Sequence, residues 1–453
     1  MNYKNVFKKF SIRVLCFSIV LNLIVLFYGH SSGYANRPEL EQSNYTKSAK
    51  VHTLQPEKIN LSGEYGLWVQ EINKQIEVHW ITAKPDSGFL KVMRQDKLLY
   101  EFVTPVSQSH NVTYDKPKGD FVILQYGSLN NIRDKHETVI YFKEKRPKSN
   151  FNKVDSIYVL GDIHGEFDNL VQLLSNAKVV DADLNWIANK KHLVALGDLF
   201  DRGQDVTKTL WFLYKLEKQA DRAGGKVHIL LGNHEIMTFS NDLRYLSAKE
   251  NLIATMHQTQ YAKMFDVHHS VLGKWLASKP GVIKIDDILF AHGGVAPFYA
   301  NYSIREFNDS LNAFLHEEIF QYLLQDTITT IKIDSIQFAS RLFFFFGENS
   351  VFWHRGYVQT DTLQDDLKKV LKKFKSELHV VAHTPVKRIS EFYDGKIIAV
   401  DLADPVTEML LLVRQSKKKY KRFTIKINGE LEPLQRKSKF IKEVGVKTGL
   451  PQP

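Results

Sequence analysis

Cysteine is nearly absent from this chain, which contains one, Cys16, among 453 residues. A single thiol cannot form a disulfide within the chain, so no disulfide framework supports the fold. Cys16 also lies inside an apolar run near the amino terminus, which leaves no thiol ligand for a metal site elsewhere. Any metal site must therefore be built from oxygen and imidazole ligands.

Long apolar runs are also missing after residue 28, so we expect no membrane-spanning segment beyond that point. The early apolar run, residues 14–28, follows four basic residues and precedes small residues that end at Ala35. Because it is shorter than the roughly 20 residues that cross a bilayer, we interpret residues 1–35 as a signal peptide for export to the periplasm or the medium. An uncleaved leader that anchors the chain in the membrane is the alternative.

The remaining composition is that of a globular chain, with 43% hydrophobic and 25% charged residues, and the length predicts two or three domains. The formal net charge of +11 includes the leader cations, so it favours anionic partners only weakly. The densest basic cluster, residues 417–422, lies between two strand-like segments. We interpret it as a solvated hairpin turn rather than a phosphate or nucleic-acid patch, and we expect no nucleic-acid partner.

Two segments precede the part of the chain that carries chemistry. Residues 36–55 are polar and aperiodic, as in a linker, whereas residues 56–147 predict a small β-sandwich that resembles a fibronectin type III or immunoglobulin-like domain. This sandwich has no histidine–carboxylate cluster, so we interpret it as an accessory module. Turn residues at 73–74 and 85–88 predict hairpins there, and we expect seven strands, at 66–72, 76–83, 88–94, 97–103, 111–114, 121–126 and 137–142.

Residues 154–235 contain three short apolar strands that each end in a glycine followed by a metal-ligand side chain. The sequences at these ends are GDIHG at 161–165, GDLFDRG at 197–203 and GNHE at 232–235. Helical stretches separate the strands, which is typical of parallel βαβ units whose carboxyl ends meet at one sheet edge. We therefore expect the three loops to converge.

Two later histidines follow the same pattern, since His292 and His383 each end a strand-like run and precede a glycine or a threonine–proline turn. A lone histidine is usually a structural residue. The same arrangement, a strand that leads into a polar side chain and a turn, occurs at five places. We therefore regard His292 and His383 as candidates for the same site.

Together the five motifs resemble those of the calcineurin-like metallophosphoesterases, within their phosphoprotein phosphatase branch. The DRG sequence at 201–203 and FWHRGY at 352–357 are most similar to bacterial Shewanella-like phosphatases, although Ile236 replaces the cysteine that the family has after GNHE. The resemblance implies an α/β catalytic domain, an αββα metallophosphatase sandwich, over residues 150–435, with residues 436–453 as a tail.

The resemblance also implies a ligand set for two metal ions, manganese, iron or zinc, that share one carboxylate and a bridging hydroxide. Asp198 is the expected bridge between them. Asp162 and His164 are expected at the first metal, and the second is completed by Asn233, His292 and His383.

Four further residues have expected catalytic roles. Arg202 and Arg355 would bind phosphate oxygens, because a guanidinium fork matches two of them. His234 follows a metal ligand without being one, and is the expected general acid. Asp201 would orient His234; alternatively it caps the helix that follows.

The expected reaction is hydrolysis of a phosphomonoester, either phosphoserine, phosphothreonine or phosphotyrosine in a protein or a small phosphate ester. A phosphodiesterase or a dinucleoside polyphosphate hydrolase is the alternative within this chemistry. From another class, a non-catalytic envelope binding module would use the sandwich to hold a partner. Loss of a metal ligand would favour that last interpretation, and all six positions are filled.

Overall fold

The computed structural model describes residues 66–317, 320, 335–403, 405–416 and 419–434. The expected signal peptide, linker and tail lie outside these residues. Within the described part of the chain, no helix combines the length and the apolar character needed to cross a bilayer.

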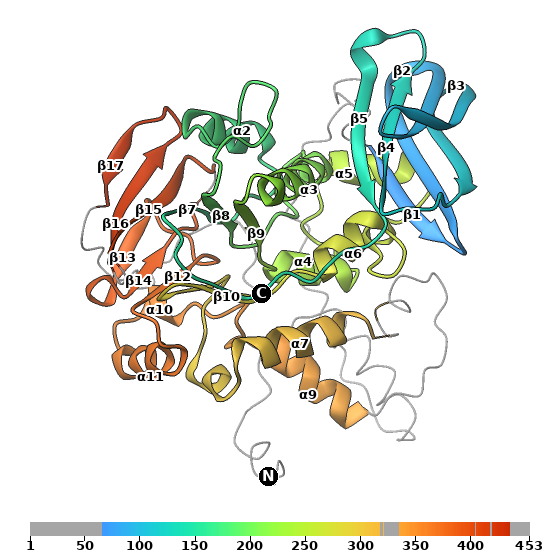
Figure 1. The fold of residues 1–453 in the computed structure, drawn as a ribbon. Helices are drawn as coiled ribbons and strands as arrows, with labels where there is room; N and C mark the ends of the chain where they lie inside the picture. The colour runs from blue at the N-terminus through green and yellow to red at the C-terminus, as the bar shows by residue number, and fades with distance from the viewer. Residues whose placement is uncertain (1–65, 318–319, 321–334, 404, 417–418, 435–453) are drawn as a thin grey trace, which may run out of the picture. The chain divides into compact units, whose positions relative to one another are not determined.

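An all-β region comes first, and the fold shows five strands there rather than seven (Figure 1). All five belong to one hydrogen-bonded sheet, in which β2 is flanked by β3 on one edge and by β1 and β4 on the other, and β5 pairs with β4. The strands are β1 (Trp68–Ile72), β2 (Gln75–Arg94), β3 (Lys97–Asp115), β4 (Phe121–Ser128) and β5 (Lys135–Tyr141).

One expected hairpin turn is confirmed and the other is wrong. Asn73 and Lys74 both have positive φ, of 50° and 66°, as a two-residue turn between antiparallel strands requires. Residues 85–88 instead form an irregularity inside β2, where the register against β3 shifts between Ile81 and Asp86. A bulge accommodates Pro85, which has no N–H to donate, without ending the strand. Four of the expected strands therefore merge into β2 and β3.

Two six-stranded sheets form the rest of the fold, in the orders β17-β16-β15-β7-β8-β9 and β13-β14-β12-β11-β10-β6. Their facing side chains share one core, to which Val159 and Val194 contribute from the first sheet and Phe290 and Val380 from the second. The first sheet contains β7 (Ser156–Leu160), β8 (His192–Ala195), β9 (Lys226–Ile229), β15 (Glu408–Ser416), β16 (Lys419–Lys426) and β17 (Leu431–Pro433). The second contains β6 (Asn150–Phe151), β10 (Val282–Ile285), β11 (Ile288–Ala291), β12 (Leu378–Val381), β13 (Ser390–Phe392) and β14 (Ile397–Ala399).

Helices pack on the outside of these sheets, which confirms the α/β fold expected for the catalytic domain. Helix α3 packs against β9 and α2, α7 packs against β10, and α11 contributes Leu367 and Leu371 to the shared core (Figure 1). The helices are α2 (Phe167–Asn176), α3 (Val206–Arg222), α4 (Asn233–Phe239), α5 (Ala248–Met256), α6 (Val271–Ala277), α7 (Ile304–Leu315), α9 (Ser335–Phe346), α10 (Gly356–Gln359) and α11 (Gln364–Phe374).

The strand directions bring the expected loops to one edge. Strands β7, β8 and β9 are parallel neighbours, so the three loops that follow them meet at the carboxyl ends of these strands. In the second sheet β11 and β12 are also parallel, and they lead into His292 and His383. Strands β15 and β16 pair antiparallel, and residues 419–422 of the basic cluster lie within β16, whereas residues 417–418 lie outside the described part of the chain.

The all-β region is bonded to helices of the catalytic domain. The indole N–H of Trp211, in α3, donates to the carbonyl of Leu67 at 2.9 Å, and the ring of His257 bonds to the carbonyl of Gly66. The backbone N–H of Glu71 donates to the carbonyl of His269 at 2.9 Å. These bonds attach β1 and the residues before it to the helical layer.

We predict that Trp211→Phe loosens this attachment, because it leaves the buried carbonyl of Leu67 without its donor. The free energy of unfolding should fall by about 1–3 kcal/mol. Hydrogen exchange of residues 66–72 should become faster. Trp186→Phe is the matched control, since it removes an indole bond to the nearby carbonyl of Asn189 within the catalytic domain. Equal exchange rates at 66–72 in both variants would contradict the attachment.

Candidate active site

Several residues in the loops that carry the site have a left-handed backbone conformation, which is unfavourable for residues with a Cβ atom. Five non-glycine residues there have positive φ: His164 (47°), Asp198 (50°), Asp201 (68°), Arg202 (63°) and His383 (65°). Each such conformation costs about 1 kcal/mol or more, so surrounding bonds must impose it. A positive φ turns the chain sharply at the strand end and directs the side chain into the site.

Hydrogen bonds between the first two loops provide that restraint. The backbone N–H groups of Ile163 and His164 both donate to the carbonyl of Asp198, at 3.0 and 2.9 Å, and the N–H of Gly203 donates to the carbonyl of His164 at 2.9 Å. The approach is so close that a Cβ at position 203 would lie 2.0 Å from the carbonyl oxygen of His164. Glycine is therefore required there for steric reasons.

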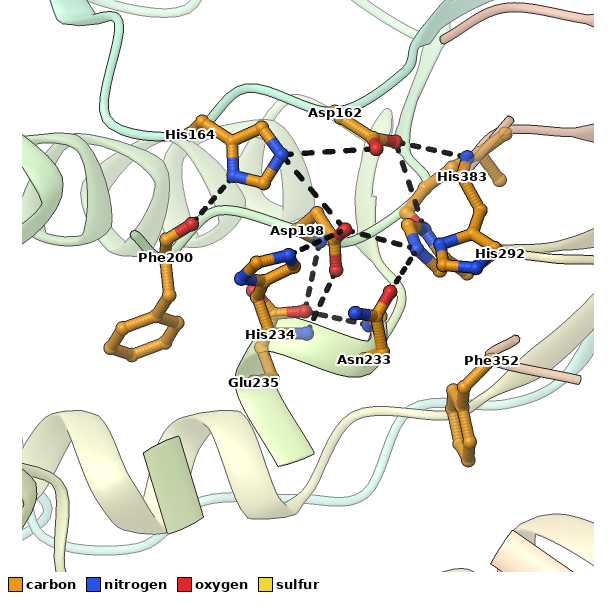
Figure 2. A network of polar contacts seen from close by, with 12 residues as sticks. Asp162, His164, Asp198, Phe200, Asn233, His234, Glu235, His292, Phe352 and His383 are labelled. Atoms are coloured by element: carbon orange, nitrogen blue, oxygen red, sulfur yellow. Dashed lines mark hydrogen bonds and ion pairs between the residues drawn. The ribbon is translucent and has the colours of Figure 1, made fainter. Parts of the chain in front are cut away.

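The six expected metal ligands converge around Asp198 (Figure 2). Two groups of ligand atoms share this carboxylate: one consists of His164, Asp198 and His234, and the other of Asp198, His292 and His383; within each group all atoms lie within 4.8 Å of one another. Asp162 and Asn233 complete the cluster.

Asp162 and Asn233 are placed by contacts with the histidines. Asp162 Oδ2 is 3.9 Å from Nε2 of His164, and its Oδ1 accepts from the backbone N–H of His383 at 3.2 Å. Asn233 Oδ1 is 3.0 Å from Nε2 of His292. The structure thus brings together every ligand that the sequence predicted.

The tautomers of the histidines suit metal binding. His164 donates from Nδ1 to the carbonyl of Phe200 at 2.7 Å, and His292 donates from Nδ1 to the carbonyl of Leu196 at 2.8 Å. Their Nε2 atoms therefore present lone pairs to the cluster. The buried Nε2 atoms of His164 and His383 have no hydrogen-bond partner in the described structure. Bound cations would satisfy these buried acceptor atoms, which face carboxylates and have no hydrogen-bond partner.

The surroundings of His292 support the same fit. Its Nε2 lies 3.0 Å from the amide oxygen of Asn233 and 3.2 Å from Oδ2 of Asp198. When Nδ1 donates to the carbonyl of Leu196, these three atoms are all acceptors in the neutral state, so a proton or a cation must lie among them. Burial lowers the pKa of His292, but Asp198 and Asp162 outweigh burial and raise it to about 9.

Glu235 holds the backbone at Asp198 in place, a role that the sequence did not predict. Its buried carboxylate accepts backbone N–H bonds from Asp198 at 2.9 Å, Leu199 at 2.7 Å and Gly232 at 2.6 Å. One side chain therefore holds the second loop against the third. The signal was its place in the GNHE motif, three residues after Gly232.

His234 and Asp201 form a buried pair, with His234 Nδ1 donating to Asp201 Oδ2 at 2.6 Å. Burial lowers the pKa of His234, but Asp198 and the bond to Asp201 raise it above its ordinary value. Nε2 of His234 lies 3.8 Å from Asp198 Oδ2, so it faces the cluster. The alternative that Asp201 caps the next helix is wrong, because the N-cap of α3 is Asp205.

Both expected arginines lie near the cluster. Burial raises the pKa of Asp162 to about 6, and the charge of Arg202, which is exposed, is among the effects that oppose this rise. Arg355, from a distant part of the chain, donates from Nη1 to the carbonyl of His383 at 2.6 Å. The two guanidinium groups reach the site from different loops.

Asp401 is a buried acid near the site that sequence reasoning missed. Burial, together with Asp162 and Asp198, raises its pKa well above the ordinary value, while Arg202 and Arg355 oppose the shift. It follows β14 after one residue, Val400. An acidic residue that follows a strand is only part of the signal that identified Asp162 and Asp198, because Val400 stands where those two motifs have a glycine.

We predict that Glu235→Gln weakens the cluster as well as the fold. The new amide group would face a backbone N–H that needs an acceptor, so the free energy of unfolding should fall by about 1–3 kcal/mol. Metal analysis should show fewer ions per chain. Glu250→Gln is a matched control, because Glu250 is also fully buried but accepts only from the backbone and hydroxyl of Thr207. If both variants retained equal metal content, Glu235 would be a residue of the fold alone.

Comparisons with known proteins agree with this geometry. A sequence model of the family described as calcineurin-like phosphoesterase matches residues 156–405. Shewanella-like protein phosphatase 1 of Plasmodium berghei (strain Anka) is 27% identical over 58% of this chain and 73% of its own. A symmetrical bis(5'-nucleosyl)-tetraphosphatase of Vibrio campbellii is 27% identical over 37% of this chain and 56% of its own.

Among solved structures, the cold-active protein-tyrosine phosphatase of a psychrophilic Shewanella species superimposes with a TM-score of 0.65 and 27% identity. The match covers 82% of this chain and 99% of that one, so it extends beyond the residues that the family model matches. The chain therefore belongs to the calcineurin-like phosphoesterase family, and it is a metal-dependent phosphatase.

Proposed function

We propose that the protein is a dinuclear phosphomonoesterase that removes phosphate from phosphotyrosine in proteins. The observation that supports the two-metal site is that Asp198 lies near two sets of expected ligands: its Oδ2 is 4.0 Å from Nε2 of His164, which is 3.9 Å from Asp162, and 3.2 Å from Nε2 of His292, which forms a group with His383. When bound there, manganese, iron or zinc ions supply Lewis-acid stabilisation of the phosphate and an activated water. The protein's own residues must then bind the phosphate, orient it and move the proton.

Arg202 and Arg355 bind the phosphate in this proposal. Arg355 is oriented by the carbonyl of His383, and Arg202 is fixed at its backbone by a bond to the carbonyl of Tyr245 at 3.0 Å. Because the guanidinium group of Arg355 is already oriented, it loses little freedom when phosphate binds, and both guanidinium groups match the phosphate oxygens. They also stabilise the charge that the equatorial oxygens carry in the transition state.

His234 donates a proton from Nε2 to the leaving oxygen. Asp201 accepts from Nδ1, so the imidazole keeps one orientation and its protonated form is stabilised. This arrangement matches a general acid, whereas the other histidines of the cluster are bonded at Nδ1 to neutral carbonyls or carry an unpartnered Nε2.

The substrate class is supported by the Shewanella protein-tyrosine phosphatase, which is similar over 82% of this chain. The same chemistry would also hydrolyse phosphoserine, phosphothreonine and small phosphate esters. A second candidate, hydrolysis of dinucleoside tetraphosphates, is favoured by the similarity to the Vibrio enzyme, but that similarity covers 37% of this chain. The intact ligand cluster favours an enzyme over a purely binding module.

We also propose that the protein is exported, from the basic and apolar residues at 1–35, which lie outside the described part of the chain. Its substrates would then be phosphorylated proteins or phosphate esters of the envelope or the medium. The proposed activity does not depend on the proposed export, because all the residues with expected roles lie within residues 162–383.

The metal proposal is tested by Asp198→Asn. Because Asp198 belongs to both ligand groups, replacing its carboxylate with an amide should weaken both sites together. We expect turnover of p-nitrophenyl phosphate to fall by at least about 10³-fold and metal content to drop below one ion per chain. A chelator should have the same effect on the wild-type protein. Two ions per chain with wild-type turnover would overturn the shared bridge.

The role of His234 is tested by His234→Asn across esters whose leaving groups differ in pKa. Loss of a general acid costs about 10²- to 10⁴-fold, and the loss should be greatest for alkyl phosphates, whose leaving oxygen needs the proton. Activated aryl phosphates such as p-nitrophenyl phosphate should lose far less. Metal content is the control and should remain at the wild-type level. Equal losses along the series would make His234 a residue that positions phosphate or water.

A further inference from the structure

The loop between α4 and α5, residues 240–247, borders the active site, and the function proposed above assigns no role to its side chains. Asp242 is buried, and Arg244 donates to both of its carboxylate oxygens, from Nε at 2.9 Å and from Nη2 at 2.7 Å. A bidentate pair of this kind fixes the relative orientation of the two side chains. The loop is therefore a firm support for the next residue, Tyr245.

Tyr245 contacts two active-site residues at once. Its carbonyl accepts from the backbone N–H of Arg202 at 3.0 Å. Its ring centroid lies 5.4 Å from that of His234, and the two planes are inclined by 49°. Tyr245 is partly exposed, whereas its neighbour His234 is buried.

The position of Tyr245 beside His234 affects which leaving groups fit the site. In the proposed reaction His234 protonates the leaving oxygen while Arg202 binds the phosphate, so the rest of the leaving group extends from the site next to the imidazole. The other aromatic ring near His234 is His164, at 4.8 Å between centroids, and it is buried in the cluster. Among these two rings, Tyr245 is the one that a leaving group can meet.

We propose that Tyr245 is a specificity-determining residue whose ring forms one wall of the leaving-group pocket and favours aromatic leaving groups. This inference rests on the phosphatase function proposed above. Two aromatic rings pair favourably, in offset or edge-to-face arrangements, with centroids about 4.5–7 Å apart. A saturated ring of the same size fills the space without that additional attraction.

Benzyl phosphate and cyclohexylmethyl phosphate are suitable probes, because both release a primary alcohol and they differ mainly in the aromaticity of the ring. General-acid catalysis should therefore treat them alike. For the full-length, metal-loaded wild type we expect kcat/KM to be about two- to tenfold higher for the benzyl ester. The preference should appear mainly in KM if the ring already meets the bound substrate.

Variants then assign the preference to one ring. Tyr245→Leu should abolish it, and Tyr245→Phe, which keeps the ring and removes the hydroxyl, should retain it. Tyr100→Leu is the control, since Tyr100 is a partly buried tyrosine in β3, outside the catalytic domain. Metal content and melting temperature are measured for each variant.

Two results would overturn the inference. The first is a wild-type protein that hydrolyses both esters equally, which decides the matter even if Tyr245→Leu does not fold. The second is an unchanged ratio in Tyr245→Leu, including an equal loss on both esters, which would make Tyr245 a support for His234. If the metal-loaded wild type hydrolyses neither these esters nor p-nitrophenyl phosphate, the proposed function itself fails.

Discussion

The site depends on one carboxylate, Asp198, being held at the meeting point of three loops. Its backbone is in the left-handed conformation, with φ of 50°, and its carbonyl accepts two N–H bonds from the first loop. Its own N–H donates to Glu235, which also accepts from Gly232 in the third loop. Because Glu235 binds both loops through one side chain, the second and third loops cannot move apart without leaving a buried carboxylate unsatisfied. The position of Asp198, the expected bridging ligand, is therefore set by this hydrogen-bond network.

The all-β region stands outside this network but is not loosely joined to the catalytic domain. It contributes none of the ten residues with expected roles, which lie between Asp162 and His383, yet its first strand is bonded to α3 and to the segment before α6 through Trp211 and His269. The similarity to the Shewanella structure also extends beyond the catalytic residues. The all-β region can therefore be accessory to the chemistry and still contribute to the stability of the protein.

Much of the site was predictable from sequence because it is encoded locally. A short apolar strand, a glycine and a ligand are adjacent in the chain, and parallel strands place their ends together whatever the rest of the fold does. The hairpin at Asn73 was predictable for the same reason. Glu235 lies in a recognised motif, but its three N–H partners come from two loops and cannot be read from spacing. The continuity of β2 through Pro85 also depends on its neighbours, since β3 pairs with β2 on both sides of the irregularity, whereas β1 pairs only before it and β4 only after it.

His164 and His234 show why residue type alone does not assign a role. Their rings lie 4.8 Å apart, both are buried, and the Nε2 atom of each lies within 4.0 Å of the same oxygen of Asp198. They differ at Nδ1, where His164 donates to a neutral carbonyl and His234 donates to the carboxylate of Asp201. Burial consequently lowers the pKa of His164 to about 3, whereas the two carboxylates overcome burial and raise the pKa of His234. His292 also bonds to a neutral carbonyl at Nδ1, although its pKa is raised, so the partner at Nδ1 and not the pKa distinguishes the expected ligands His164 and His292 from the expected proton donor His234.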